Sequence, residues 1–150
     1  MKNNRFGFTL VEMLGVIFII SLLMGILYPT IAKVRTKGKI AKAQAEIEAL
    51  AVALRMFESD LGTYPPSTTA ESDALHKYLG IAVTSTALNI VVGPYMEFKS
   101  KDLSASNQYK DPWGNAYIYA APGTNNTNSF DIHSLGPDGS DNTADDVKNW

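Results

Sequence analysis

Gly7-Phe8-Thr9-Leu10-Val11-Glu12-Met13 opens an apolar run that carries no further charged residue as far as Ala32. About 20 apolar residues at a helical rise of about 1.5 Å per residue match a hydrocarbon core about 30 Å thick. The sequence therefore predicts one membrane-spanning helix over residues 8–32. An unpaired carboxylate inside lipid is costly, so Glu12 needs a partner that the run itself does not supply.

The rest of the chain has the composition of one small folded domain. Of the 150 residues, 45% are hydrophobic and 19% are charged, and the formal net charge is -2. A nearly neutral composition of this kind gives no sign of nucleic-acid binding. The chain has no cysteine. An exported domain would therefore be held by packing, hydrogen bonds or a bound ion rather than by disulfides.

A short basic leader precedes the apolar run. Residues 1–7 contain Lys2 and Arg5 and no acid, as signal sequences do, but the glycine stands before the apolar run rather than after it. This arrangement resembles the prepilin motif of type IV pilins and of the pseudopilins of type II secretion. The resemblance implies that residues 1–7 are a leader peptide, which a prepilin peptidase removes between Gly7 and Phe8 before it methylates the new amine of Phe8.

The same resemblance implies that Glu12 and Phe8 act in assembly. In this family the glutamate is thought to meet the free N-terminal amine of a neighbouring subunit, so that assembly cancels two buried charges. Further along the span, Gly25 and Pro29 weaken the helix, and we expect a kink or local melting between them. A simple bend at the membrane surface and a segment that loses helical order in the filament both agree with this pattern.

A second pattern begins after the span. Apolar residues recur at spacings of three and four, which predicts an amphipathic helix over residues 33–61 that continues the membrane helix. Its stripe, the expected core of a globular domain, consists of Ile40, Ala43, Ile47, Leu50, Leu54, Phe57 and Leu61. By the positive-inside rule the cations that follow the span favour a cytoplasmic domain, whereas the prepilin motif implies the opposite orientation. These cations are Lys33, Arg35, Lys37, Lys39 and Lys42.

The remainder divides into two parts. Residues 62–110 predict a variable loop region with one short helix, from Ser72 as candidate N-cap to Leu79, and with no regular pattern over Ile81–Val92. Residues 111–150 predict a β-hairpin and an acidic C-terminal loop. In the hairpin the alternating run Tyr117–Ala120 pairs with Phe130–His133.

The last loop carries Asp138, Asp141, Asp145 and Asp146. Such a group is either an acidic segment that points into water or a site for a hard cation, because carboxylates and carbonyls are the ligands that calcium prefers. Its spacing is not that of an EF-hand. The phrases Asp111-Pro112-Trp113-Gly114-Asn115 and Asp145-Asp146-Val147-Lys148-Asn149-Trp150 resemble the major pseudopilin of type II secretion. The resemblance implies a structural Ca²⁺ held by the Leu135 carbonyl and by Asp138, Asp141, Asp145 and Asp146.

An enzymatic alternative is a membrane-tethered metal-dependent hydrolase that uses Asp131, His133 and Asp138. A catalytic zinc or two-metal site usually needs more imidazole ligands and an identifiable base, and the chain has only 2 histidines. We therefore predict a structural protein and no catalytic residues.

The resemblance implies a type IV pilin-like α+β fold, in which a long N-terminal α-helix with a membrane half and an amphipathic half packs on a small C-terminal antiparallel β-sheet. It implies a single-pass protein of the bacterial inner membrane with its C-terminal domain in the periplasm. The implied function is the major pseudopilin of type II secretion. Such a subunit forms a helical homo-oligomeric filament with minor pseudopilins, a prepilin peptidase and an inner-membrane assembly platform as partners. The alternative is a subunit of an extracellular type IV pilus.

Overall fold

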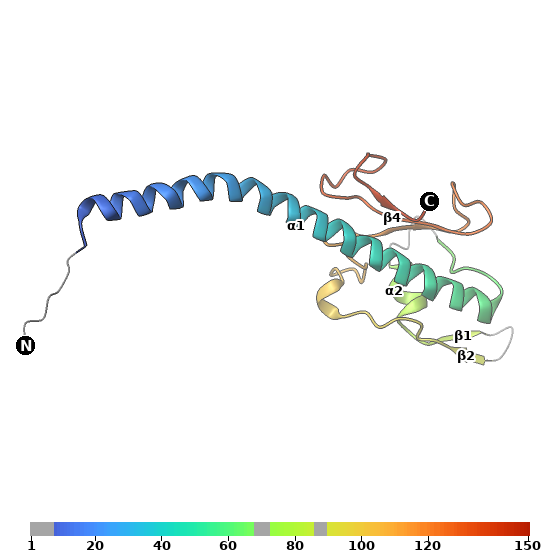
Figure 1. The fold of residues 1–150 in the computed structure, drawn as a ribbon. Coiled ribbons are helices and arrows are strands. Elements are labelled where there is room, and N and C mark those ends of the chain that lie inside the picture. Colours follow the sequence, from blue (N-terminus) through green and yellow to red (C-terminus); the bar gives the residue numbers. More distant parts are fainter. Residues whose placement is uncertain (1–7, 68–72, 86–89) are drawn as a thin grey trace, which may run out of the picture. The chain divides into compact units, whose positions relative to one another are not determined.

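A computed structural model describes residues 8–67, 73–85 and 90–150 of the chain (Figure 1). The helices are α1 (Leu10–Leu61) and α2 (Ala74–Leu79), with a 3₁₀ turn at Ser100–Asp102. The strands are short: β1 (Val83–Ser85), β2 (Ile90–Val92), β3 (Ile118–Ala120), β4 (Asp131–Ser134) and β5 (Val147–Lys148). One long helix and small antiparallel sheets confirm the predicted α+β class.

Helix α1 spans 52 residues without a break. The membrane run and the amphipathic run are therefore one helix, as predicted. The local melting expected between Gly25 and Pro29 is not part of this structure, because every residue there is helical. A proline removes a single backbone donor, and the neighbouring donors keep the helix in place. By its internal packing the chain divides into two units, Met1–Lys37 and Gly38–Trp150.

The core of the second unit is built on the predicted stripe of α1. Leu50 and Leu54 are fully buried, as are Leu79 of α2 and Ile132 of β4. Burying one such side chain contributes about 1.5–3 kcal/mol. The same cluster holds Ala43, Ile47, Ala53, Phe57, Leu75, Tyr109, Tyr117, Phe130 and Val147. The sequence stripe thus identified the face of α1 onto which the rest of this unit folds.

Two separate sheets complete the second unit. Strands β1 and β2 form an antiparallel hairpin with Thr84 opposite Val91. Strands β3, β4 and β5 form a three-stranded sheet in that order, with Tyr119 opposite Ile132 in the first pair. The predicted pairing of the two alternating runs is confirmed. The third strand was not predicted, and neither was the β1–β2 hairpin in the segment that lacked a pattern.

The C-terminus closes the sheet partly through a side chain. Asn149 accepts a hydrogen bond from the backbone N–H of Ile132 through Oδ1 at 2.9 Å, and its Nδ2 donates to the Phe130 carbonyl at 3.1 Å. The amide thereby continues the ladder beyond the two residues of β5. In the loop region, α2 begins at Ala74 with Asp73 at the cap position. The predicted cap, Ser72, lies outside the described residues.

Tyrosine hydroxyls tie loops and sheet to α1. Tyr117 donates to the Glu46 carboxylate at 2.8 Å, and Tyr95 donates to Asp60 at 2.9 Å. The pKa of Tyr95 is raised to about 12, mainly by burial. The hydrogen bond to the Asp60 carboxylate and the negative charge of that carboxylate contribute to the same rise. Burial and Glu46 likewise raise the pKa of Tyr117. Both hydroxyls therefore stay protonated and keep donating at physiological pH.

Candidate functional site

The first candidate site is the start of α1. Thr9 is the residue before the helix, and its Oγ1 accepts a hydrogen bond from the backbone N–H of Glu12 at 3.2 Å. In return the Glu12 carboxylate accepts the backbone N–H of Thr9 at 2.8 Å and the Thr9 hydroxyl at 2.7 Å. This reciprocal arrangement is a capping box, which satisfies donors that a helix otherwise leaves unpaired. Glu12 therefore has an intramolecular partner in the single chain.

Sequence reasoning gave Glu12 no partner within its own chain, although the signal was present. Glu12 lies three positions after Thr9 at the start of an apolar run, which is the spacing of a capping box. Phe8 precedes the helix and is 74% exposed. Gly7, the other residue of the predicted cleavage bond, lies outside the described residues.

The helix beyond the cap presents apolar side chains in every direction. By length and composition α1 is long and apolar enough to cross a membrane, and its most apolar stretch is not buried. The large apolar residues from Leu10 to Ile31 are 45–80% exposed, apart from the aromatic Tyr28 at 81%. Water does not favour such a surface, so this half of α1 needs lipid or other copies of itself.

The second candidate site is the acidic loop between β4 and β5. Three carboxylates of this loop lie within hydrogen-bond distance of the Thr143 hydroxyl. That Oγ1 lies 2.8 Å from Asp145 Oδ1, 3.2 Å from Asp146 Oδ1 and 3.5 Å from Asp138 Oδ1. One hydroxyl proton serves one acceptor at a time. The Thr143 hydroxyl hydrogen bond holds the pKa of Asp145 below its usual range, against the opposing effect of burial. The Asp145 carboxylate therefore remains charged at neutral pH.

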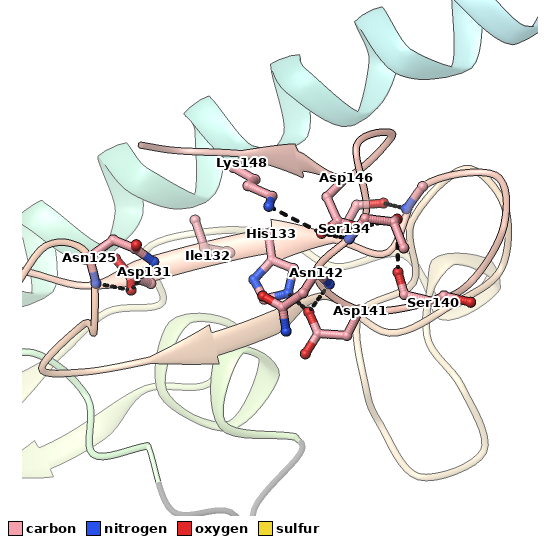
Figure 2. A network of polar contacts seen from close by, with 12 residues as sticks. Asn125, Asp131, Ile132, His133, Ser134, Ser140, Asp141, Asn142, Asp146 and Lys148 are labelled. Carbon is pink, nitrogen blue, oxygen red and sulfur yellow. Dashed lines mark hydrogen bonds and ion pairs between the residues drawn. The ribbon is translucent and has the colours of Figure 1, made fainter.

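Lys148 supplies one positive charge to the loop, with its Nζ 3.3 Å from Asp146 Oδ2 (Figure 2). The Asp146 side chain is fully buried, and it also accepts the backbone N–H of Thr143 at 3.1 Å. Gly136, at φ +64°, packs directly against the Asp145 main chain, where a side chain would have no room. The two arms of the loop are therefore in contact.

Asp141 faces a different partner. Its Oδ1 lies 2.9 Å from His133 Nε2, on the strand that leads into the loop (Figure 2). His133 Nδ1 is buried and makes no hydrogen bond within the described residues. The structure thus brings together Asp138, Asp145 and Asp146 of the predicted ligand set, and it pairs Asp141 with histidine.

The donor types of this loop suit a hard cation, because they are carboxylate and hydroxyl oxygens and the ion pair with Lys148 balances only part of their charge. The carboxylates are directed at Thr143 and at backbone N–H groups. Among residues 8–67, 73–85 and 90–150, no three acidic or imidazole groups are arranged as a metal site. The ion therefore stays a prediction from the donor set.

The buried carboxylate of Asp111 anchors the start of the acidic loop. Asp111 is 5% exposed, and its Oδ1 accepts the backbone N–H groups of Trp113, Gly114 and Asn115 at 2.8–2.9 Å. Its Oδ2 accepts a hydrogen bond from the Ser134 hydroxyl at 2.6 Å. The Ser134 hydroxyl oxygen in turn accepts a hydrogen bond from the Gly136 backbone N–H at 3.1 Å. Asp111 thus connects its own turn to the first residues of the acidic loop. The sequence marked this turn but not its long-range partner.

The residues of the hydrolase alternative are each held by separate neighbours. The Asp131 carboxylate accepts the backbone N–H of Asn125 at 2.7 Å (Figure 2). It also accepts the backbone N–H of Asn126 at 2.9 Å. Burial raises the pKa of Asp131, but these hydrogen bonds outweigh it and hold the pKa below its usual range. Asp131 therefore organises the β3–β4 loop, whereas Asp138 belongs to the Thr143 group.

Two family profiles match the chain. Residues 2–28 match the prokaryotic N-terminal methylation motif, and residues 30–150 match type II secretion system protein G. The first match covers most of the predicted leader and α1 as far as Tyr28, and the second covers the end of the apolar run and the whole second unit. Together they cover both candidate sites.

Individual relatives agree with these profiles. The chain is 33% identical to a type II secretion system core protein G of Pseudomonas aeruginosa, over 99% of this chain and 97% of that protein. It is 34% identical to the corresponding protein of Escherichia coli K12, over 99% and 92%. In structure it is similar to the major pseudopilin from the type 2 secretion system of enterohaemorrhagic Escherichia coli. That match has a TM-score of 0.54 and 27% identity, and it covers 79% of this chain and 92% of that one. The chain belongs to the type II secretion system protein G family.

Proposed function

We propose that the chain is the major pseudopilin of a type II secretion system, a structural subunit and not an enzyme. The leader is removed between Gly7 and Phe8, the Phe8 amine is methylated, and the apolar half of α1 holds the subunit in the inner membrane until it joins a periplasmic filament. The observation that carries this proposal is the first half of α1, over residues 10–32, where the large apolar residues are exposed on all sides and the one acid, Glu12, lies in the first turn. Such a surface is suited to storage in lipid and to packing against identical helices.

The capping box of Thr9 and Glu12 is the contact of Glu12 that would change on assembly. In the single subunit Thr9 satisfies the Glu12 carboxylate. In the filament we expect Glu12 to meet the Phe8 amine of a neighbour, which is created by the cut. The amine is then neutralised where it would otherwise be a buried, unpaired charge. This exchange gives the correct axial register an energetic advantage.

The extracellular pilus remains the second candidate, since the methylation motif serves both kinds of filament. The match of residues 30–150 to the secretion protein favours the pseudopilus, because that segment contains the whole globular unit. The proposed role is to extend the filament through the periplasm so that folded proteins are exported across the outer membrane, in concert with minor pseudopilins and an inner-membrane assembly platform.

A deletion strain tests this proposal. Cells that lack the chain should lose several folded proteins from the culture supernatant, retain them in the periplasm, and recover export when the gene is restored. Mass spectrometry of the restored protein should find a chain that begins at methylated Phe8. Unchanged export together with a chain that begins at Met1 would contradict both the function and the processing.

We also propose that a structural Ca²⁺ binds the acidic loop. Asp138, Asp145 and Asp146 would hold it, with Thr143 and the Leu135 carbonyl beside them. Asp141 is the least favoured of the five predicted ligands because it already contacts His133. Ca²⁺ supplies positive charge that Lys148 alone does not, and it would link the loop after β4 to β5. This clamp would take the place of a disulfide in a chain without cysteine.

Removal of Ca²⁺ should lower the melting temperature of the full chain in detergent on the order of 10 °C. A ligand present at about 100 times its dissociation constant stabilises the folded state by about 2.7 kcal/mol, and about 1 kcal/mol shifts a domain of this size by several degrees. Circular dichroism with excess Ca²⁺ and with chelator measures the shift. Asp145→Asn should remove most of it, whereas Glu97→Gln, an exposed acid outside the loop, should keep it. Equal melting temperatures with and without Ca²⁺ in the wild type would refute the clamp.

A further inference from the structure

We infer that Lys33, Arg35 and Lys37 form a binding site for anionic phospholipid headgroups at the outer end of the membrane span. This inference rests on the proposed insertion of α1 in the membrane. All three side chains are exposed, and each follows the apolar run within two turns of the helix. In the sequence no Asp or Glu occurs between Glu12 and Glu46. The three cations therefore have no acid within reach along α1.

The other two cations of this stretch have partners in the globular unit. Lys42 forms an ion pair with Glu46 at 3.4 Å, and Lys39 Nζ lies 6.0 Å from the centroid of the Trp113 ring. Within the described parts of the chain, no ion pair or ring contact involves Lys33, Arg35 or Lys37. Lys33 and Lys37 are four residues apart on one helix face, where like charges repel. The residues that the structure describes do not compensate this repulsion, and an anionic partner from outside would relieve it.

Position along the helix matches the headgroup layer. The polar layer on each side of a bilayer is about 5–7 Å thick, and residues 33–37 rise about 6 Å along a helix. Tyr28, which is 81% exposed, stands about one and a half turns earlier, where aromatic rings mark the boundary between hydrocarbon and headgroups. The aromatic ring and the cations thus follow the order of a membrane surface.

The three cations are distributed around α1 in a way that favours lipid headgroups over a second copy of the chain as their partner. At about 100° per residue, Lys37 lies about 40° from Lys33, but Arg35 lies about 160° from it, on the opposite side. A neighbouring helix covers one face, whereas a headgroup layer surrounds the whole helix. The acidic part of a second copy would therefore reach only some of these charges. The geometry points to the membrane surface, where each cation gives about a fivefold preference for anionic lipid.

The inference also accounts for the unusual charge distribution beside the span. Cations at this end oppose the orientation that the prepilin motif implies. As ligands for anionic headgroups they hold an unassembled subunit at the correct depth, and this contact has to be released when the subunit leaves the membrane.

The test uses the full chain in detergent micelles that contain equal amounts of phosphatidylglycerol and phosphatidylcholine. Native mass spectrometry counts the lipids retained on each chain. The wild type should retain phosphatidylglycerol in excess, and K33Q/R35Q/K37Q should lower this excess by about tenfold or more. K39Q/K42Q, a change of two neighbouring cations that have internal partners, should leave it close to the wild-type value. The excess should also decrease as salt is added.

An excess that is absent in the wild type, unchanged in the triple variant, or lost equally in both variants would overturn the inference. Normal lipid retention in the triple variant together with loss of subunit cross-links would instead assign these cations to a second copy, and it would overturn the lipid site as well. Flotation of the chain with vesicles after alkaline washing is measured separately. Failure to float would reject membrane insertion and with it the proposed function, whereas flotation without lipid preference would reject only the headgroup site.

Discussion

Glu12→Gln should abolish filament formation, whereas Thr9→Ala should leave it largely intact. Glutamine still accepts the Thr9 backbone N–H, so the capping box survives in the first variant, but the charge that neutralises the Phe8 amine of a neighbour is lost. A charge left unpaired in the membrane interior costs about 2.5–3.5 kcal/mol for each subunit that is added. Alanine at position 9 removes the capping hydroxyl, which contributes about 1 kcal/mol to the helix start, and keeps the carboxylate.

Cross-linking of membrane fractions and electron microscopy of sheared filaments measure this effect. The folded state of each variant is checked by the melting temperature of the second unit, which neither substitution should change because both positions lie outside it. Filaments from Glu12→Gln and none from Thr9→Ala would show that Glu12 acts through its helix cap alone.

Asp111→Ala should lower the free energy of unfolding of the globular unit by about 3 kcal/mol or more. The substitution removes an acceptor from three backbone N–H groups and from the Ser134 hydroxyl, all around a carboxylate that is 5% exposed. Hydrogen bonds to a charged group contribute about 1.5–3 kcal/mol each, and donors left buried without a partner add a penalty. The effects are not additive, so the sum of four bonds is an upper limit.

Urea denaturation followed by near-ultraviolet circular dichroism measures the change, with the full chain in detergent. Asp60→Asn is the matched control, because that carboxylate lies at the surface and, among the described residues, accepts a hydrogen bond from the Tyr95 hydroxyl alone. The control should change the free energy of unfolding by less than about 1 kcal/mol. A midpoint for Asp111→Ala close to that of the control would mean that the turn holds its shape without this carboxylate.

Elements with a long repeat were predictable from the sequence. The stripe through Leu50 and Leu54 identified α1 and its buried face, and the two alternating runs identified the β3–β4 pair. By contrast, β1 and β2 lie in a segment without a clear alternation, and β5 has only two residues, too few to establish a period. Strand β5 forms by pairing with β4, which lies well before it in the chain, and that information is not local.

The candidate site residues also divide into those that local sequence identifies and those that depend on contacts distant in the chain. Glu12 was identifiable because an acid in an apolar run is rare, and its cap with Thr9 is a local motif. The acidic loop was identifiable from composition, but the choice of ligands was not, because the contact between His133 and Asp141 depends on how the loop folds back on β4. Asp111 was missed as an anchor because Ser134 is 23 residues away in the sequence.

The capping box also bears on how a filament of this chain comes apart. Phe8 and Thr9 precede the helix, and the Thr9 N–H belongs to the peptide bond after the cleavage point, so processing leaves the cap unchanged. On the proposed pairing, a subunit that enters the filament exchanges two hydrogen bonds to Thr9 for one amine, and a subunit that leaves regains them. The regained hydrogen bonds offset part of the cost of separating Glu12 from the amine. Shortening of the filament would therefore need less work at its N-terminal contacts than the loss of the amine alone implies, and the same subunits would be available for repeated cycles of growth.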